Sequence, residues 1–174
     1  FEELKGLLTT EEYEAARATV NNAFYTSPEI ASCMHQALLE FGFRNGNVLE
    51  PSMGVGNFFG SVPTPLQRCN YYGVEVDSIS GRIAKQLYQS TNISITGFEK
   101  TTYPDNFFDV AIGNVPFGDY KLYDPKYNKY NFRIHDYFLA KAIDQVRPGG
   151  IIAFITTKGT LDKSNPSVRK YLAE

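Results

Sequence analysis

Cysteine and long apolar runs are both scarce in this sequence. Its two cysteines, Cys33 and Cys69, stand far apart, and no Cys and His residues recur at a spacing that suits a metal ion. No apolar run approaches the roughly eighteen residues of a membrane span, and no signal-peptide pattern opens the chain. We therefore expect a soluble, cytoplasmic protein with no metal and no membrane partner. Both thiols are expected to be small buried side chains in a reducing compartment.

Positive charge is not in excess either. The chain has 17 Lys and Arg against 19 Asp and Glu, a formal net charge of −2. A domain that grips a phosphate backbone unaided is normally basic, so binding to nucleic acid would need other segments of a longer protein. Phe1 in place of Met, and a helical pattern that still runs at Glu174, lead us to expect such a longer parent chain.

What the sequence does have is an alternation of apolar strands and helices. With 43% hydrophobic residues, the chain can bury the core of one compact domain. Helices are expected at 28–41, 78–90 and 134–146, and strands at 47–50, 71–77, 93–96, 107–112 and 151–155. Nearly continuous apolar strands that alternate with helices form a parallel sheet covered on both faces. We therefore predict an α/β, doubly wound Rossmann-like fold with a mostly parallel sheet.

Local signals add detail to the helices. Thr9–Glu12 fits a capping box, ahead of an amphipathic helix that includes Ala16 and Val20. Ser27 and Pro28 form a second helix start. Residues 148–150 are expected as a turn. The helix at 78–90 is expected to bury three apolar side chains, those of Ile79, Ile83 and Leu87.

The stretch 47–60 has the pattern of a ligand-binding turn. A short apolar strand ends on Glu50 and is followed by Gly54, Gly56 and a helix start. Glycine lacks a Cβ and tolerates positive φ, so such a turn lets backbone N–H groups approach a ligand of nucleotide size. An ordinary loop is the alternative interpretation. Ligands of parallel sheets sit beyond the carboxyl ends of the strands, so the same edge is expected to gather Glu50, Glu75, 96–98 and 114–117.

Four short motifs stand in register along the chain: Phe24-Tyr25-Thr26-x-Pro28, Leu49-Glu50-Pro51-x-x-Gly54-x-Gly56-x-Phe58, Gly73-Val74-Glu75-x-Asp77 and Asn114-x-Pro116-Phe117. Together they resemble the motifs of S-adenosylmethionine-dependent DNA methyltransferases specific for the N6 amine of adenine, in the order of the γ class. The resemblance implies a methyltransferase fold, S-adenosylmethionine as cofactor and DNA as partner, within a bacterial restriction-modification or mobile-element protein. It divides the chain into N-terminal helices with the first cofactor motif (1–44) and a catalytic core that ends before a target-recognition region (45–174).

The resemblance also implies a role for each motif residue around the cofactor. Glu75 accepts hydrogen bonds from the ribose hydroxyls, Glu50 pairs with the ammonium of the methionine part, and Tyr25 and Thr26 approach its carboxylate. Phe98 contacts the cofactor adenine. The glycine loop consists of Pro51, Gly54 and Gly56. The structural alternatives are a solvated acid for Glu75, turn residues for Tyr25 and Thr26, and a core aromatic for Phe98.

By the same resemblance, Asn114–Phe117 is the catalytic motif and acts on an adenine flipped out of the duplex. The exocyclic amine is a poor nucleophile because its lone pair is delocalised into the ring. The Asn114 side-chain oxygen and the Val115 carbonyl accept its two hydrogens, Pro116 keeps residue 115 extended, and Phe117 stacks on the base. A strand-ending turn is the alternative interpretation of these residues.

Two positions depart from the family pattern. Val115 stands in place of the first proline of the motif, and the lost rigidity predicts a modest reduction in preorganisation. Gly97 stands where many members carry an aspartate that binds the adenine amine of the cofactor. Glu99, two residues further on, is the candidate replacement.

The connection 119–133 interleaves tyrosines with basic residues, which suits stacking on bases beside contacts to phosphates. A packed surface loop fits this composition equally well. Three other functions stay open: methylation of a glutamine amide in a protein, methylation of adenine in RNA, and a non-catalytic binding module. Val115 and Gly97 favour the last of these.

Overall fold

The computed structural model describes residues 2–14 and 25–173. Within the first range the capping box is formed, because Thr9 N–H donates to the Glu12 carboxylate and Glu12 N–H donates to the Thr9 hydroxyl. Ala16, Val20 and Phe24 lie outside the described residues. No helix within the described ranges is long and apolar enough to cross a membrane.

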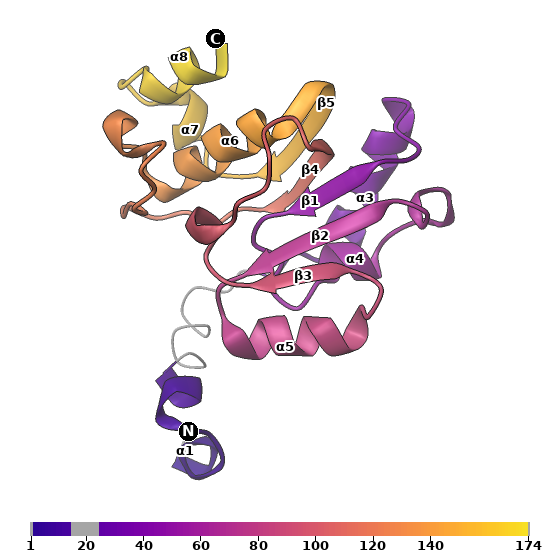
Figure 1. The fold of residues 1–174 in the computed structure, drawn as a ribbon, viewed down its shortest axis with the longest axis vertical. Coiled ribbons are helices and arrows are strands. Elements are labelled where there is room, and N and C mark those ends of the chain that lie inside the picture. The colour runs from indigo at the N-terminus through magenta and orange to yellow at the C-terminus, as the bar shows by residue number, and fades with distance from the viewer. Residues whose placement is uncertain (1, 15–24, 174) are drawn as a thin grey trace.

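Five parallel strands form one sheet in the order β3-β2-β1-β4-β5 (Figure 1). Their bounds are β1 (Asn47–Glu50), β2 (Asn70–Glu75), β3 (Asn92–Ile95), β4 (Phe108–Asn114) and β5 (Val146–Ile155). The strand order reverses between β1 and β4. In doubly wound sheets such a reversal opens a crevice beyond the carboxyl ends of the strands. This is the fold predicted from the sequence.

Helices cover both faces of the sheet. One face, with Val48 and Val110, packs against α3 and α4, and the other, with Leu49 and Ala111, packs against α6 and α8. In Figure 1, α5 lies beside β2 and β3, and α6, α7 and α8 lie together near β4 and β5. The bounds are α1 (Glu2–Leu7), α3 (Pro28–Glu40), α4 (Asn57–Gly60), η1 (Thr64–Leu66), α5 (Ser78–Leu87), η2 (Phe98–Lys100), η3 (Asn128–Tyr130), α6 (Ile134–Gln145), α7 (Gly159–Asp162) and α8 (Ser167–Ala173).

Helix α5 buries a different face from the one expected. Ile83 and Leu87 are 44% and 62% exposed, whereas Gly81 and Ala84 are buried. A Cβ atom at Gly81 would stand 2.9 Å from the Ile95 side chain. Small residues therefore let α5 lie close to β3. This close packing, and not the helical spacing of the large apolar side chains, determines which face of α5 is buried.

Two smaller expectations were also wrong. Cys33 is exposed, and only Cys69 is buried. Residues 148–150 do not form a turn ahead of the last strand but lie within β5. The pairing of β5 with β4 is irregular there, with a register shift between Phe108 and Val110. Gly149 has a φ of 77°, which accommodates the extra residues of the bulge.

Candidate functional site

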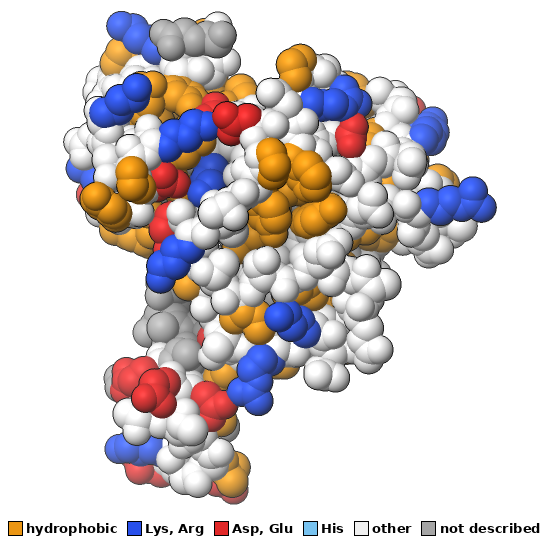
Figure 2. Space-filling model, in the orientation of Figure 1, with side chains coloured by type: hydrophobic (Ala, Val, Ile, Leu, Met, Phe, Trp, Pro, Cys, Tyr) orange, Lys and Arg blue, Asp and Glu red, His pale blue; other side chains and the backbone are white. Residues whose placement is uncertain are grey.

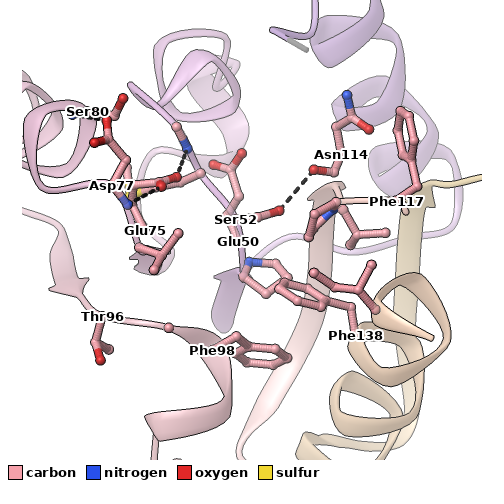
Figure 3. Close-up of a pocket in the computed structure, with 18 of the residues that line it drawn as sticks. Glu50, Ser52, Glu75, Asp77, Ser80, Thr96, Phe98, Asn114, Phe117 and Phe138 are labelled. Carbon is pink, nitrogen blue, oxygen red and sulfur yellow. Dashed lines mark hydrogen bonds between the residues drawn. The ribbon is translucent and has the colours of Figure 1, made fainter. Parts of the chain in front are cut away.

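A cavity of about 630 Å³ lies at the carboxyl ends of β1, β2 and β4, where the strand order reverses. In Figure 3, Glu75 and Asp77 lie on one side of it, Asn114 and Phe117 lie on the opposite side, and Glu50 and Ser52 lie between them. The wall also includes the aromatic side chains of Tyr25, Phe58, Phe98, Phe117, Tyr120 and Phe138. The acidic end at Glu75, after β2, and the end at Asn114, after β4, are thus separated only by β1.

Glu75 ends β2 and closes one side of the cavity. Its carboxylate accepts hydrogen bonds from Gly54 N–H and Asp77 N–H, each at 2.7 Å. Burial raises the pKa of Glu75, and the bonds from these two backbone groups act in the opposite direction. The carboxylate therefore ties the glycine turn to the end of β2 and keeps lone pairs for a ligand.

Glu50 ends β1 and is 2% exposed. Its Oε2 atom has no hydrogen-bond partner. Burial, followed by the nearby charge of Glu75, raises the pKa of Glu50 well above its ordinary value. The described wall residues carry four carboxyl groups, those of Glu50, Glu75, Asp77 and Glu99, and no Lys, Arg or His. A buried carboxylate without a partner destabilises the protein, so this cavity is built to accept a cation with hydrogen-bond donors.

The glycine turn between β1 and α4 has the expected geometry. Gly54 and Gly56 have φ values of 57° and 89°, a region that suits glycine. Gly54 lines the cavity and lies against the Tyr25 ring, since a Cβ there would stand 3.4 Å from that ring. Gly56 is not part of the cavity wall; a Cβ there would collide with the Tyr88 ring. Its contribution is to shape the turn as the N-cap of α4.

The first motif meets this turn from α3. Ser27 caps α3 as expected, and Tyr25 and Thr26 precede it on the cavity wall. Tyr25 is 54% exposed, whereas Thr26 is buried and its carbonyl accepts a hydrogen bond from the Asn57 side chain at 2.9 Å. That bond fixes the first motif against α4.

Phe98, in η2 after β3, satisfies both interpretations that the sequence left open. It lines the cavity and is also a core residue, 2% exposed. Its ring lies 5.0 Å from that of Phe138 and 6.2 Å from that of Tyr137, both in α6. One ring therefore anchors η2 in the core and presents apolar surface to a ligand.

The motif 114–117 follows β4 at the other end of the cavity. Asn114, Val115, Pro116 and Phe117 all line the wall. Val115 is 1% exposed, whereas Phe117 is 43% exposed at the mouth. The Ser52 hydroxyl, from the glycine turn, donates to the Asn114 carbonyl at 2.9 Å (Figure 3). The two motifs thus share a direct hydrogen bond.

The connection 119–133 is partly packed and partly exposed. Tyr127 is buried, and Tyr130 stacks on Phe132 at 5.2 Å. Lys126 pairs with Asp105 and Asp144, each at 2.9 Å. These side chains are occupied within the protein, and stacking on bases remains open only to others in this segment.

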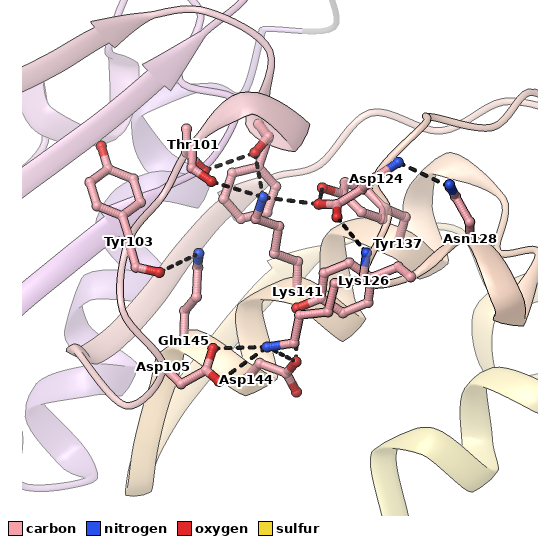
Figure 4. Close-up of polar contacts among 12 residues, drawn as sticks. Thr101, Tyr103, Asp105, Asp124, Lys126, Asn128, Tyr137, Lys141, Asp144 and Gln145 are labelled. Carbon is pink, nitrogen blue, oxygen red and sulfur yellow. Dashed lines mark hydrogen bonds and ion pairs between the residues drawn. The ribbon is translucent and has the colours of Figure 1, made fainter.

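Lys141 of α6 holds this connection against η2, on the Phe98 side of the cavity (Figure 4). Its buried ammonium donates to the carbonyls of Phe98 and Thr101 at 2.8 and 3.2 Å, and to the Asp124 carboxylate at 3.2 Å. Tyr137 donates to the same carboxylate at 2.7 Å. Burial lowers the pKa of Lys141, while Asp124 acts to raise it.

Surface charge is mixed on the face drawn in Figure 2. Lys and Arg side chains stand among Asp and Glu side chains, and hydrophobic side chains gather in the middle of the face. This agrees with the nearly balanced composition of the chain. The described side chains include no group of three or more His, Cys, Asp or Glu that could hold a metal ion.

Sequence reasoning placed eleven of its twelve candidate residues on the cavity wall, all but Gly56. It missed Ser52, Asn57 and Phe138. Ser52 occupies a variable position within the glycine motif, and Phe138 lies in a helix distant in sequence. No local pattern marked Ser52, Asn57 or Phe138.

Residues 70–174 match the family model described as Eco57I restriction-modification methylase. The chain is 31% identical over 147 residues to Defense against restriction protein B of Escherichia phage P1, covering 82% of this chain and 6% of that protein. It is 31% identical over 94 residues to Type II methyltransferase M.CvrRI of Paramecium bursaria Chlorella virus XZ-6E, covering 54% of this chain and 24% of that protein. The chain therefore spans at most about a quarter of either relative.

Solved structures similar to this chain include S-adenosylmethionine-dependent methyltransferases. A putative enzyme from Methanococcus maripaludis matches with a TM-score of 0.56 at 10% identity, over 95% of this chain and 71% of that one. A TehB-like enzyme from Corynebacterium glutamicum matches with a TM-score of 0.58 at 14% identity, over 92% and 82%. The predicted Rossmann-like methyltransferase fold is thereby confirmed.

Proposed function

We propose that this chain, which belongs to the Eco57I restriction-modification methylase family, binds S-adenosylmethionine and transfers its methyl group to the exocyclic amine of adenine in DNA. One observation carries the proposal. A cavity lined by carboxylates and aromatic rings, suited to an aromatic cation, ends at Asn114–Phe117. The core at 45–174 supplies most of this site, and the segment just before α3 supplies Tyr25 and Thr26.

The cavity fits each part of the cofactor. Glu50 pairs with the ammonium, because its buried Oε2 needs a charged donor. Glu75 faces the ribose hydroxyls, and Phe98 gives the adenine ring an apolar surface. Tyr25 and Thr26 lie where the glycine turn meets α3, near the carboxylate end. S-adenosylmethionine, when bound, supplies an activated methyl group on a positively charged sulfur.

The chain's own residues prepare the amine. The Asn114 side-chain oxygen and the Val115 carbonyl accept the two amine hydrogens, which turns the nitrogen lone pair out of the ring plane and towards the cofactor. Val115 precedes Pro116, whose ring disfavours the helical region for residue 115 and so restricts the direction of its carbonyl. Phe117, exposed at the cavity mouth, stacks on the flipped base. The proton of the methylated amine is acidic and passes to water.

Methyl transfer in vitro tests this proposal. The chain, with any segments that flank it in its natural protein, is incubated with labelled S-adenosylmethionine and DNA, RNA or protein. Mass spectrometry of the digest then identifies the modified unit. We expect N6-methyladenine from DNA, lost by about 10²-fold or more in Asn114→Ala, the scale of removing one preorganised acceptor.

Asn92→Ala is the matched control. It is the same asparagine-to-alanine substitution, made at the amino end of β3 and away from the cavity. Equal activity of the wild type and Asn114→Ala would remove Asn114 from the mechanism. Label in cytosine, RNA or protein would redirect the substrate, and cofactor binding without transfer to any of them would identify a non-catalytic module.

A further inference from the structure

The peptide group between Asn114 and Val115 is held at both of its polar ends. The Asn114 carbonyl accepts a hydrogen bond from the Ser52 hydroxyl at 2.9 Å. Val115 N–H donates to the carbonyl of Ile155, the last residue of β5, at 3.2 Å. One bond comes from the glycine turn (Figure 3) and the other from the neighbouring strand, so two separate elements fix one peptide plane.

The second of these bonds depends on the residue at 115 not being proline. Asn114 pairs with Ile155 at the end of the β4–β5 ladder, and the bond from Val115 extends the ladder one residue further. Proline has no backbone N–H and could not make it. The valine loses the ring that restricts φ, but it gains a ladder bond and a side chain buried in the core.

We infer that Ser52 is a positioning residue for methyl transfer, which with the Val115–Ile155 bond supplies the rigidity that a proline would give. This inference rests on the proposed function of Asn114. The orientation of this peptide plane affects the direction of the Asn114 side chain and the φ angle of Val115. Pro116 restricts the other side of Val115, so its carbonyl has little remaining freedom.

The glycine turn does not need Ser52 for its own shape. Met53 N–H donates to the Val74 carbonyl at 2.9 Å, and Gly54 N–H donates to Glu75 at 2.7 Å. Gly56 N–H closes the turn onto the Met53 carbonyl at 2.9 Å. Losing the Ser52 hydroxyl therefore leaves the cofactor side intact and frees only the Asn114 side.

The test compares Ser52→Ala, Ser52→Thr and Ser61→Ala. Ser61 is the matched control, because its hydroxyl donates to the Asn57 carbonyl at 2.8 Å but Ser61 does not line the cavity. In Ser52→Ala we expect amide exchange of Val115 in the ligand-free chain to quicken about tenfold and kcat to fall about tenfold, the effect of one partly buried hydrogen bond. The dissociation constant of S-adenosylmethionine should stay within about twofold, and Ser52→Thr should restore both values.

Two results would overturn the inference. One is an unchanged Val115 exchange rate in Ser52→Ala, and the other is a rise in the cofactor dissociation constant that accounts for the lost activity. Exchange is measured without cofactor or DNA. If the wild type transfers no methyl group to DNA, the proposed function fails, while the exchange data still decide whether Ser52 fixes this peptide.

Discussion

The carboxyl group of Glu99 lies over the Cα atom of Gly97, at the place where any other residue at 97 would carry its Cβ. Both residues line the cavity beside Phe98. The Glu99 carboxyl thus occupies the space of a side chain at 97, and glycine at 97 makes room for it. We therefore expect Glu99 to replace the aspartate that the family pattern has at 97.

Glu99→Gln should therefore weaken the binding of S-adenosylmethionine about tenfold, or about 1.4 kcal/mol, because a carboxylate accepts an amine hydrogen more strongly than an amide oxygen does. Calorimetric titration measures this, with Glu40→Gln at the exposed end of α3 as the control. Gly97→Asp should also weaken binding, since its side chain would collide with Glu99. Tighter binding by Gly97→Asp would show that Glu99 is not the acceptor.

Glu50 should release a proton when the cofactor binds. Its pKa is raised by burial and by Glu75. The ligand-free Glu50 carboxyl therefore keeps its proton at pH values where an ordinary glutamate is already ionised. A cation at Oε2 lowers that pKa, and affinity should rise with pH across this range. Calorimetry in buffers of different ionisation enthalpy measures the proton released. Glu50→Gln should abolish the release, and an unchanged buffer dependence in that variant would contradict the assignment.

The residues that gather at the carboxyl edge of the sheet could be predicted, because strand ends and glycine turns are visible in the local sequence and the topology of a parallel sheet brings them together. Strand-end acids such as Glu50 and Glu75, and glycines with positive φ, follow a pattern that sequence shows directly. The face that α5 buries could not be predicted in this way, because it depends on how closely Gly81 approaches Ile95. Large apolar residues at helical spacing do not reveal such an approach.

Contacts between distant segments also escaped the sequence. Ser52 meets Asn114 only after β1 and β4 pair, and Lys141 meets Phe98 only after α6 packs on the sheet. The loop 119–133 was equally consistent with base stacking and with packing. The structure packs Tyr127 of this loop, whose hydroxyl donates to Asp144 together with that of Tyr171 in α8, and leaves Tyr120 and Tyr123 exposed.

The buried pair of Lys141 and Asp124 should make a large and strongly coupled contribution to stability. Removing one partner leaves the other charge buried, so Lys141→Met should lower the free energy of unfolding by about 3–5 kcal/mol. Asp124→Asn keeps an acceptor for Tyr137, and the double variant should lose less than the sum of the two. Urea unfolding at one pH measures all three.

Lys126→Met is the control for this cycle. Its ion pairs with Asp105 and Asp144 lie at the surface, and its removal should cost below about 1 kcal/mol. Strict additivity of the Lys141 and Asp124 changes would contradict the coupling.

His35 should make stability fall on mild acidification. It is 1% exposed in α3 against Phe58, and burial lowers its pKa below the ordinary 6.5. Below about pH 6.5 the unfolded chain therefore binds more protons than the folded one, and the stability that neutral His35 contributes is lost progressively as pH drops towards the folded pKa. His35→Leu removes this contribution. The Tm difference, variant minus wild type, should increase as the pH is lowered from 7.5 to 5.5. A difference that stays constant would contradict the assignment.

Phe117 should act on the target base and not on the cofactor. It is 43% exposed at the cavity mouth, on the side of Asn114 away from Glu75 (Figure 3). Stacking on a base contributes about 1–3 kcal/mol, so Phe117→Ala should raise KM for DNA about tenfold or more, with the cofactor dissociation constant unchanged. Phe117→Tyr should keep most of the effect. Phe41→Ala, 76% exposed at the end of α3 and outside the cavity wall, is the control. If Phe117→Ala weakened cofactor binding and left KM for DNA unchanged, the aromatic ring would belong to the cofactor site.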